Sequence, residues 1–423
     1  MFKKNAAWLL LIPIFYIWGS FLIQNENHHL RYIWTDAEGY YIYLPALFVH
    51  GSFKQIPCRD STMIQYLPPD NKMFTKFTYG TALLESPFFL MGHLSRKLQK
   101  LPLNLAYTED YGVSILFAAC FYFTLGIFFM FKTLKRYFNK QIVVYLTLMS
   151  LTIGSNALYY AIRQPGYSHI YSFAFISIFI YYTPLFLEKV TKRNTFYISL
   201  LYGFIVLIRP TNASILLFLL LYNCYSMENI LNRFQFWLSH WKKIGIACLG
   251  ILLPMIPQMI YWQYLFGKPV TYSYDKAGFD WLHPKIQNVW FDVLNGLFPY
   301  TPIMMMVVLG MLLSSWHRKM NGWLISSLFL GMSYVFGSWC MWWFGGAHGQ
   351  RSFVEWMPFF SLPMGYLLDI LFKQKLWLKT LGVLMTLFLI YLNIRMTNLH
   401  DSGWYGDAWT WKTYFETIGF PLK

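Results

Sequence analysis

Apolar segments of helix length recur through the chain, and short stretches rich in Lys and Arg separate them. Only 12% of the residues are charged, which is about half the share found in soluble proteins. Aromatic residues make up 21% of the chain, and Trp and Tyr favour the boundary between lipid and water. These features together predict an all-α polytopic integral membrane protein.

About eleven segments are expected to cross the membrane as helices. The segment 82–95 is not counted, because its short length and Pro87 favour an interfacial or re-entrant helix. With that segment left out, the basic loops all fall on the cytoplasmic side, as the positive-inside rule requires. The N-terminus is then cytoplasmic and the C-terminus extracytoplasmic. The expected spans are about 7–23, 111–131, 141–160, 169–187, 195–209, 213–226, 244–266, 303–315, 323–343, 354–372 and 380–397.

The chain is expected to form a single transmembrane domain over residues 1–423. Its extracytoplasmic parts are the loop 24–110, which carries interfacial helices, the loop 267–302 and the tail 398–423. A helix that faces lipid throughout needs about 20 residues. Several expected spans are shorter, and we expect them to line a cavity: 195–209, 213–226 and 303–315.

The formal charge of +16 does not indicate nucleic-acid binding, because the cations lie in short loops and no nucleic-acid motif is present. The chain has no Walker loop and no dinucleotide fingerprint, which argues against direct use of a nucleotide. No HExxH motif and no close His and Asp triplet marks a metal site. The five cysteines include no CxxC pair, so no disulfide framework is indicated.

Two acids, Asp36 and Glu38, follow the first apolar segment and lie among aromatic residues at the expected outer membrane edge. Two residues apart on a helix, they point in nearly opposite directions. Thr35 and Glu38 match a capping box, which gives Glu38 a structural task. Asp36 is then the first helical residue, and the helix N-terminus keeps it ionised as a general base must be. The alternative for Asp36 is a solvated loop acid.

Three expected outer turns each carry an Arg, and the turn at 342–353 is also rich in glycine. Glycine lets the backbone approach a ligand closely, and Arg near a helix N-terminus suits a phosphate. Turns that share one cavity would attract a phosphate or pyrophosphate headgroup. The alternative is that each Arg only snorkels to the interface. The candidate substrate-binding residues are Arg163, His169, Arg209, His348, Gln350 and Arg351, with Lys76 and Tyr79 as part of the cavity wall or only as packing residues.

Aromatic residues also accompany acids in the loop 267–302, where Tyr272, Tyr274 and Trp281 lie near Asp275 and Asp280. Such a combination can hold a sugar, although the acids could equally be solvated. The aromatic run 404–411 in the tail is expected to anchor the chain at the membrane interface.

The chain has one span, a long outer loop that opens with Asp36-Ala37-Glu38, an interfacial helix and some ten further spans. In this order it resembles the GT-C superfamily of membrane glycosyltransferases. It is most similar to the bacterial multispanning enzymes that use sugars linked to polyprenyl phosphate. The resemblance covers nearly the whole chain in architecture. At the level of residues it depends on the acidic motif and on the Arg-bearing turns.

The resemblance implies an inverting transferase of the bacterial cytoplasmic (inner) membrane. Its donor would be a polyprenyl-phosphate-linked sugar, and its acceptor a glycan, a lipid or a protein. Asp36, or Glu38 in its place, would be the general base, although such an acid could instead bind the acceptor or a divalent cation. Arg351, Arg163 and Arg209 would hold the departing lipid phosphate.

Two other functions stay open. A lipid or glycan flippase or transporter commonly shows internal repeats and ionisable groups near the bilayer midplane, and neither is evident in this sequence. A lipid-linked glycan polymerase or ligase would share the outward-facing cations. It would depend less on an acid placed directly after the first span.

Overall fold

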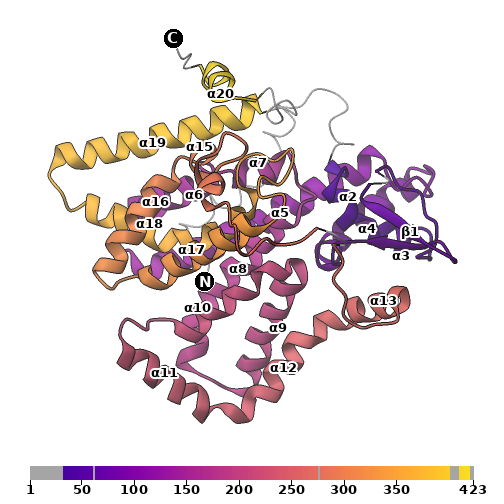
Figure 1. Cartoon of the computed structure of the whole chain (residues 1–423), viewed down its shortest axis with the longest axis horizontal. Helices are drawn as coiled ribbons and strands as arrows, with labels where there is room; N and C mark the ends of the chain where they lie inside the picture. Colours follow the sequence, from indigo (N-terminus) through magenta and orange to yellow (C-terminus); the bar gives the residue numbers. More distant parts are fainter. Residues whose placement is uncertain (1–31, 61, 275–276, 401–408, 420–423) are drawn as a thin grey trace.

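The computed structural model describes residues 32–60, 62–274, 277–400 and 409–419. Helices dominate these ranges (Figure 1), and four of the described helices are long and apolar enough to cross a membrane. They indicate a mainly helical membrane protein, as expected from the sequence. The expected span 7–23 lies outside the described residues. The four helices are α5 (Glu109–Tyr137), α8 (Ser168–Glu188), the segment Trp241–Phe266 and α19 (Leu376–Leu399).

The segment Trp241–Phe266 is built from η4 (Trp241–Lys243), α12 (Ile244–Leu252), η5 (Leu253–Met255) and α13 (Ile256–Phe266). The other expected spans coincide largely with shorter apolar helices, so the total of eleven spans stays a prediction. The remaining helices of the bundle are α6 (Gln141–Thr152), α7 (Ala157–Ile162), α9 (Lys192–Ile208), η3 (Pro210–Ile215), α10 (Leu216–Leu221), α11 (Met227–Ser239), α14 (Ile286–Phe291), α15 (Leu297–Tyr300), α16 (Met304–Trp316), α17 (Gly322–Ser338), η6 (Arg351–Trp356), α18 (Met357–Leu371) and α20 (Trp411–Thr417).

The expected span 141–160 is broken between α6 and α7. The break leaves backbone carbonyl groups without helical hydrogen-bond donors. A buried side chain of α19 supplies the missing donor. Asn393 Nδ2 donates to the carbonyl oxygens of Ile153 and Ser155, at 2.9 and 2.8 Å. Irregular backbone inside an apolar bundle is tolerated when protein groups satisfy its hydrogen bonds.

The described part of the segment expected to form the first outer loop contains a β-hairpin that the sequence did not predict. Its helices are α2 (Asp36–Tyr41), α3 (Tyr43–Phe48) and α4 (Gly80–Leu98). The strands β1 (Ile64–Leu67) and β2 (Lys72–Thr75) pair antiparallel, with Ile64 opposite Thr75. Tyr261 of α13 donates its hydroxyl to the Met73 carbonyl at 2.8 Å, which ties the hairpin to the helical bundle.

Helix α8 is central to the bundle, because it packs against α5, α9, α18 and η6. Gly126 of α5 permits the close approach to α8, since a Cβ there would lie 2.5 Å from the Phe173 ring. Small residues allow membrane helices to pack closely in this way. The chain thus places the start of α8 next to α9 and η6, where the candidate site lies.

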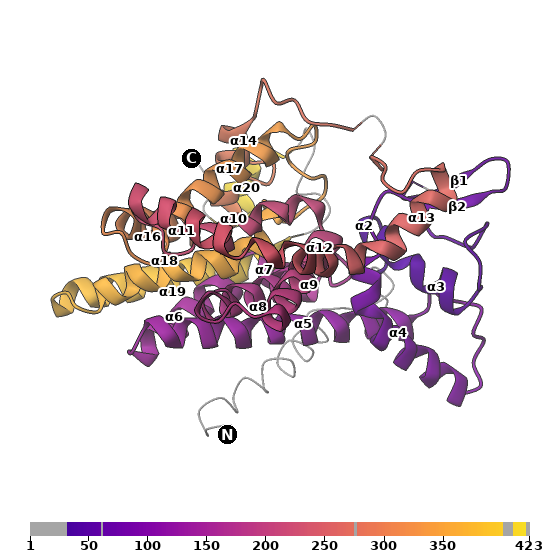
Figure 2. The same ribbon diagram turned by 90° about the horizontal axis from the view of Figure 1, so that it is seen from below.

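The basic loops assigned to the cytoplasmic side meet at the opposite end of α8. Lys140 Nζ donates to the Phe372 carbonyl at 3.1 Å, and the Asn223 N–H donates to Asn321 Oδ1 at 2.6 Å. In Figure 2 the α5–α6 and α18–α19 connections lie at the left, and α2 lies toward the right. One end of the bundle is therefore basic, as a single membrane face requires.

The aromatic tail packs inward where it is described. Trp409 is buried, and its indole N–H donates to the Tyr300 hydroxyl at 2.8 Å. Tyr414 of α20 donates to the Pro299 carbonyl at 2.7 Å. These two aromatic residues fix the tail to α15, so the expected interfacial anchor is wrong for Trp409. Residues 401–408 lie outside the described ranges.

Candidate functional site

An ion pair joins α2 to η6, the short helix before α18. Asp36 is the first residue of α2, as the sequence predicted, and Arg351 is the first residue of η6. Arg351 Nη2 donates to Asp36 Oδ2 at 2.6 Å, and the two side chains are only 15% and 17% exposed. The guanidinium also lies over the Tyr167 ring, 5.1 Å from its centroid. Packing thus brings together two charged residues that are 315 positions apart.

The turn that presents Arg351 is held by buried amides. Asn295 Nδ2 donates to the carbonyls of Trp343 and Gly345, both at 2.9 Å. Gln350 Nε2 donates to the Trp342 carbonyl at 2.8 Å. The sequence predicts Gln350 as a substrate-binding residue. In the structure its amide nitrogen instead stabilises this turn. Gly349 has a φ of +66°, which is why glycine is needed there.

A second charged group adjoins this pair and is centred on Glu355, a fully buried acid of η6. His169 Nδ1 lies 2.6 Å from Glu355 Oε2, and Arg209 Nε lies 2.8 Å from Glu355 Oε1. The Arg209 N–H is not aligned as a hydrogen bond, so this contact is an ion pair. Arg209 Nη1 also donates to Ser168 Oγ, which in turn donates to the Tyr40 hydroxyl of α2. The predicted residues His169 and Arg209 therefore share one network with α2.

Glu355 was not among the predicted site residues, although a signal existed. It stands within the apolar stretch 353–372. An acid inside an expected span is costly, and it marks a partner or a function by default.

Aromatic residues and a further cation complete this region. Lys76 Nζ lies 5.8 Å from the centroid of the Tyr274 ring and has no hydrogen bond or ion pair within the described ranges. Burial raises the pKa of Tyr274, with smaller contributions from Tyr40 and Asp36 that Arg209 and Arg351 oppose. Burial likewise raises the pKa of Tyr40 and of Tyr167. The tyrosines therefore stay protonated at neutral pH and can donate hydrogen bonds.

Glu38 has a structural role, but not the predicted one. Thr35 has a φ of +53° and makes no cap hydrogen bond, because its Oγ1 pairs with the Tyr167 hydroxyl at 2.8 Å. The capping box is therefore wrong. The fully buried Glu38 carboxylate accepts the backbone N–H groups of Arg59 and Asp60, at 2.5 and 2.7 Å. Burial raises the pKa of the Glu38 carboxyl, and the two N–H groups offset part of that effect.

Glu38→Gln is expected to loosen the loop that precedes the hairpin. An amide offers one acceptor oxygen in place of two, so one of the N–H groups of Arg59 and Asp60 loses its partner. An unsatisfied buried donor costs about 1–3 kcal/mol. Limited proteolysis should show faster cleavage near residues 59–62, with the Tm of the bundle less affected. Unchanged cleavage would show that Glu38 does not hold this loop.

Three predicted residues do not contact the Asp36 pair. His348 is buried beside Tyr159, with ring centroids 4.8 Å apart. Burial, with the neighbouring His400 and Arg163, holds the pKa of His348 well below its ordinary value. Arg163 lies in this neighbouring cluster, and burial lowers its pKa. Tyr79 donates its hydroxyl to the Pro254 carbonyl at 2.7 Å, which fastens α4 to η5.

Gly166→Ala is expected to disturb the position of α2. A Cβ at residue 166 would lie 2.7 Å from the Tyr32 carbonyl oxygen and 2.8 Å from Ala37 Cβ, and backbone cannot yield easily there. Overpacking of this kind costs about 1–3 kcal/mol. Gly331→Ala in α17 is the matched control, because its Cβ would meet nothing within 4 Å. We expect a lower Tm for Gly166→Ala only; equal Tm values would contradict this account.

No group of three or more His, Cys, Asp or Glu side chains gathers as a metal site among the described residues. The charged partner of Asp36 is Arg351, and the Glu38 carboxylate points to the backbone of Arg59 and Asp60. The described residues do not form a cation cage here, since Mg²⁺ and Ca²⁺ need several oxygen ligands.

Comparison of the chain with protein-family models, with curated proteins and with solved structures finds no match. The geometry of the site itself therefore carries the functional inference.

Proposed function

We propose that the chain is an inverting glycosyltransferase. It would move a sugar from a polyprenyl-phosphate donor to an acceptor at the extracytoplasmic face of the bacterial inner membrane. The observation that carries this proposal is the contact between Asp36 and Arg351 beside the Arg209 and Glu355 pair. One acid that can take a proton lies next to cations that can hold an anion.

Asp36 is the proton acceptor in this proposal. The acceptor hydroxyl attacks the anomeric carbon, so a new carbon–oxygen bond forms on the face opposite the phosphate. The hydroxyl proton passes to the Asp36 carboxylate, and one correctly placed carboxylate is sufficient as the base. The bond between the anomeric carbon and the phosphate oxygen breaks, and its electron pair leaves with the lipid phosphate.

The cations stabilise the charge that develops on the departing phosphate. Arg351 uses one nitrogen for Asp36 and has further N–H groups for a phosphate. Arg209 and Lys76 lie around the same tyrosines, so they can add to that field. Cations placed in advance need no reorganisation at the moment of reaction, which is why they lower the barrier.

The arrangement of the bundle supports a membrane-bound substrate. Helix α8 has 21 residues, a length of about 30 Å, which matches the hydrocarbon core of a bilayer. Its first turn carries His169 at the candidate site, and its last residue lies at the basic end. The proposal places the site at the outer face within an eleven-span topology, where a lipid-linked donor can reach it.

The test is a transfer assay with the purified chain reconstituted in vesicles. Labelled hexose and pentose donors on polyprenyl phosphate are supplied with glycan, lipid and peptide acceptors. We expect labelled acceptor and free polyprenyl phosphate to form together. Intact donor that crosses the vesicle membrane without sugar release would instead identify a flippase and overturn the proposal.

A further inference from the structure

Helix α11 presents an uncovered apolar stripe. Met227, Leu231, Phe234 and Leu238 recur at intervals of four, three and four residues, so they share one face of the helix. Their side chains are 71%, 57%, 61% and 54% exposed. An exposed apolar stripe along a short amphipathic helix is typical of a helix that lies in the membrane interface.

The stripe is continuous with a candidate membrane span. Trp241 lies two residues after the end of α11, begins the segment Trp241–Phe266 and is 61% exposed. Ile244 and Leu249 extend the same exposed apolar surface along α12. Lys242 lies exposed between the two parts, at the basic end of the bundle. A bilayer that covers the segment Trp241–Phe266 therefore also covers the apolar stripe of α11. Lys242 then lies at the level of the lipid headgroups.

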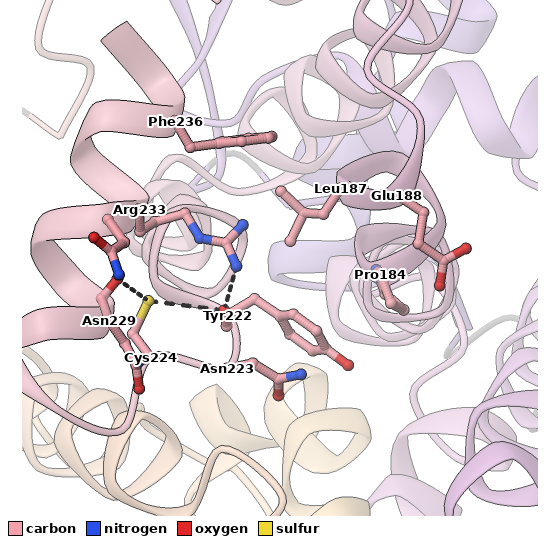
Figure 3. Close-up of a pocket in the computed structure, with 10 residues that line it drawn as sticks. Pro184, Leu187, Glu188, Tyr222, Asn223, Cys224, Asn229, Arg233 and Phe236 are labelled. Atoms are coloured by element: carbon pink, nitrogen blue, oxygen red, sulfur yellow. Dashed lines mark hydrogen bonds between the residues drawn. The ribbon is translucent and has the colours of Figure 1, made fainter. Parts of the chain in front are cut away.

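The opposite face of α11 borders a cavity of about 530 Å³, between this helix and the last turn of α8. Arg233 and Glu188 face the cavity from these two walls (Figure 3). Asn223, Asn229 and Asn232 add amide groups to the lining. Binding sites for small molecules have volumes of this order.

Contacts within the protein hold Arg233 in place, but some polar groups of the cavity make no hydrogen bond to the described part of the protein. Arg233 Nη2 donates to the Tyr222 carbonyl at 2.9 Å, and the guanidinium lies over Phe236. This leaves other N–H groups of Arg233 for a ligand. The Glu188 carboxylate has no hydrogen bond or ion pair with another residue of the described ranges. The cavity thus offers one cation and one anion on opposite walls.

We propose that this cavity binds the headgroup of a zwitterionic phospholipid from the leaflet on the basic side of the protein. The phosphodiester would bind Arg233 and the asparagine amides, and the ammonium group would face Glu188. Balanced lining charges favour such a headgroup over a purely anionic one. Helix α8 separates this cavity from His169 by about 30 Å, so the lipid site is independent of the proposed sugar transfer.

The first test measures lipid binding to the full chain by native mass spectrometry. Wild-type protein is expected to bind phosphatidylethanolamine about tenfold more tightly than phosphatidylglycerol. Glu188→Gln should remove this preference, and Arg233→Gln should weaken both lipids. Lys192→Gln is the control, because Lys192 is exposed near the same end but does not line the cavity. Equal binding of both lipids by the wild type, or wild-type binding by Arg233→Gln, would overturn the proposal.

Two further measurements separate the sources of the ligand and the role of α11. Soluble glycerophosphoethanolamine should fail to displace the lipid. Efficient displacement would overturn a lipid source, because it would show that the ligand need not be a membrane lipid.

A fluorescent amino acid at position 231, in vesicles of phosphatidylethanolamine and phosphatidylglycerol, should be quenched by nitroxide lipids and shielded from iodide. Iodide quenching without lipid quenching would show that α11 does not lie in the membrane.

Discussion

Asp36→Asn is expected to lower kcat for sugar transfer by about 100- to 10,000-fold, the range that general base catalysis contributes. Asn has nearly the same shape and can still accept a hydrogen bond from Arg351, but it cannot take the acceptor proton. The loss should therefore fall on kcat. The Tm should fall only moderately, because the amide oxygen still accepts a hydrogen bond from Arg351 although the guanidinium loses its counter-charge. The measurement is the initial rate of transfer with saturating donor.

The matched control for this variant is Asp70→Asn. Asp70 lies in the turn between β1 and β2, its side chain is 50% exposed, and its carboxylate lies 3.9 Å from Lys72 Nζ. Its replacement should leave the rate unchanged. Full transfer by Asp36→Asn would remove Asp36 from the reaction and leave it as a structural acid.

Glu355→Leu is expected to lower the free energy of unfolding by about 3–5 kcal/mol, the usual result of removing one partner from a buried ion pair. Arg209 is 16% exposed and Glu355 is fully buried, so water cannot replace the lost carboxylate. The expected signs are a much lower Tm in detergent and a low yield of folded protein.

The control for this effect removes both charges. Glu355→Leu combined with Arg209→Met leaves no unpaired ion and should regain most of the lost Tm, since apolar replacement of a whole buried pair is often neutral. A double variant no more stable than Glu355→Leu would show that the ion pair is not the origin of the loss.

The parts of the fold that sequence predicted are those set by local chemistry. The long apolar runs at α5, α8 and α19 allow only helices in lipid, because every backbone group must be satisfied within the segment. The start of α2 at Asp36 was also predictable. By contrast, the β-hairpin uses two four-residue strands, Ile64–Leu67 and Lys72–Thr75, which carry too little periodicity to identify.

Helix α11 was expected only as part of a basic loop, although local signals for a helix are present. Ser226 caps it, accepting the backbone N–H of Asn229 at 3.2 Å. Met227, Leu231, Phe234 and Leu238 also follow the helical period. The length of the helix, 13 residues, is too short for a span.

The site could be predicted only in part, because its contacts depend on packing between distant turns. Asp36 and Arg351 were each identified, yet nothing local to either residue specifies their contact across 315 positions. The capping box failed for a related reason. Thr35 Oγ1 bonds Tyr167, which is 132 positions away, and this tertiary contact replaces the local one.

The most direct test of the central claim measures the binding of polyprenyl phosphate, the expected lipid product, to three proteins. Arg351→Gln should raise the Kd about 10- to 100-fold, because the phosphate loses a charge-assisted hydrogen bond. Asp36→Asn should keep the wild-type Kd or lower it, since Arg351 is then released from its carboxylate partner. An Arg351→Gln protein that binds polyprenyl phosphate as tightly as the wild type would contradict the account.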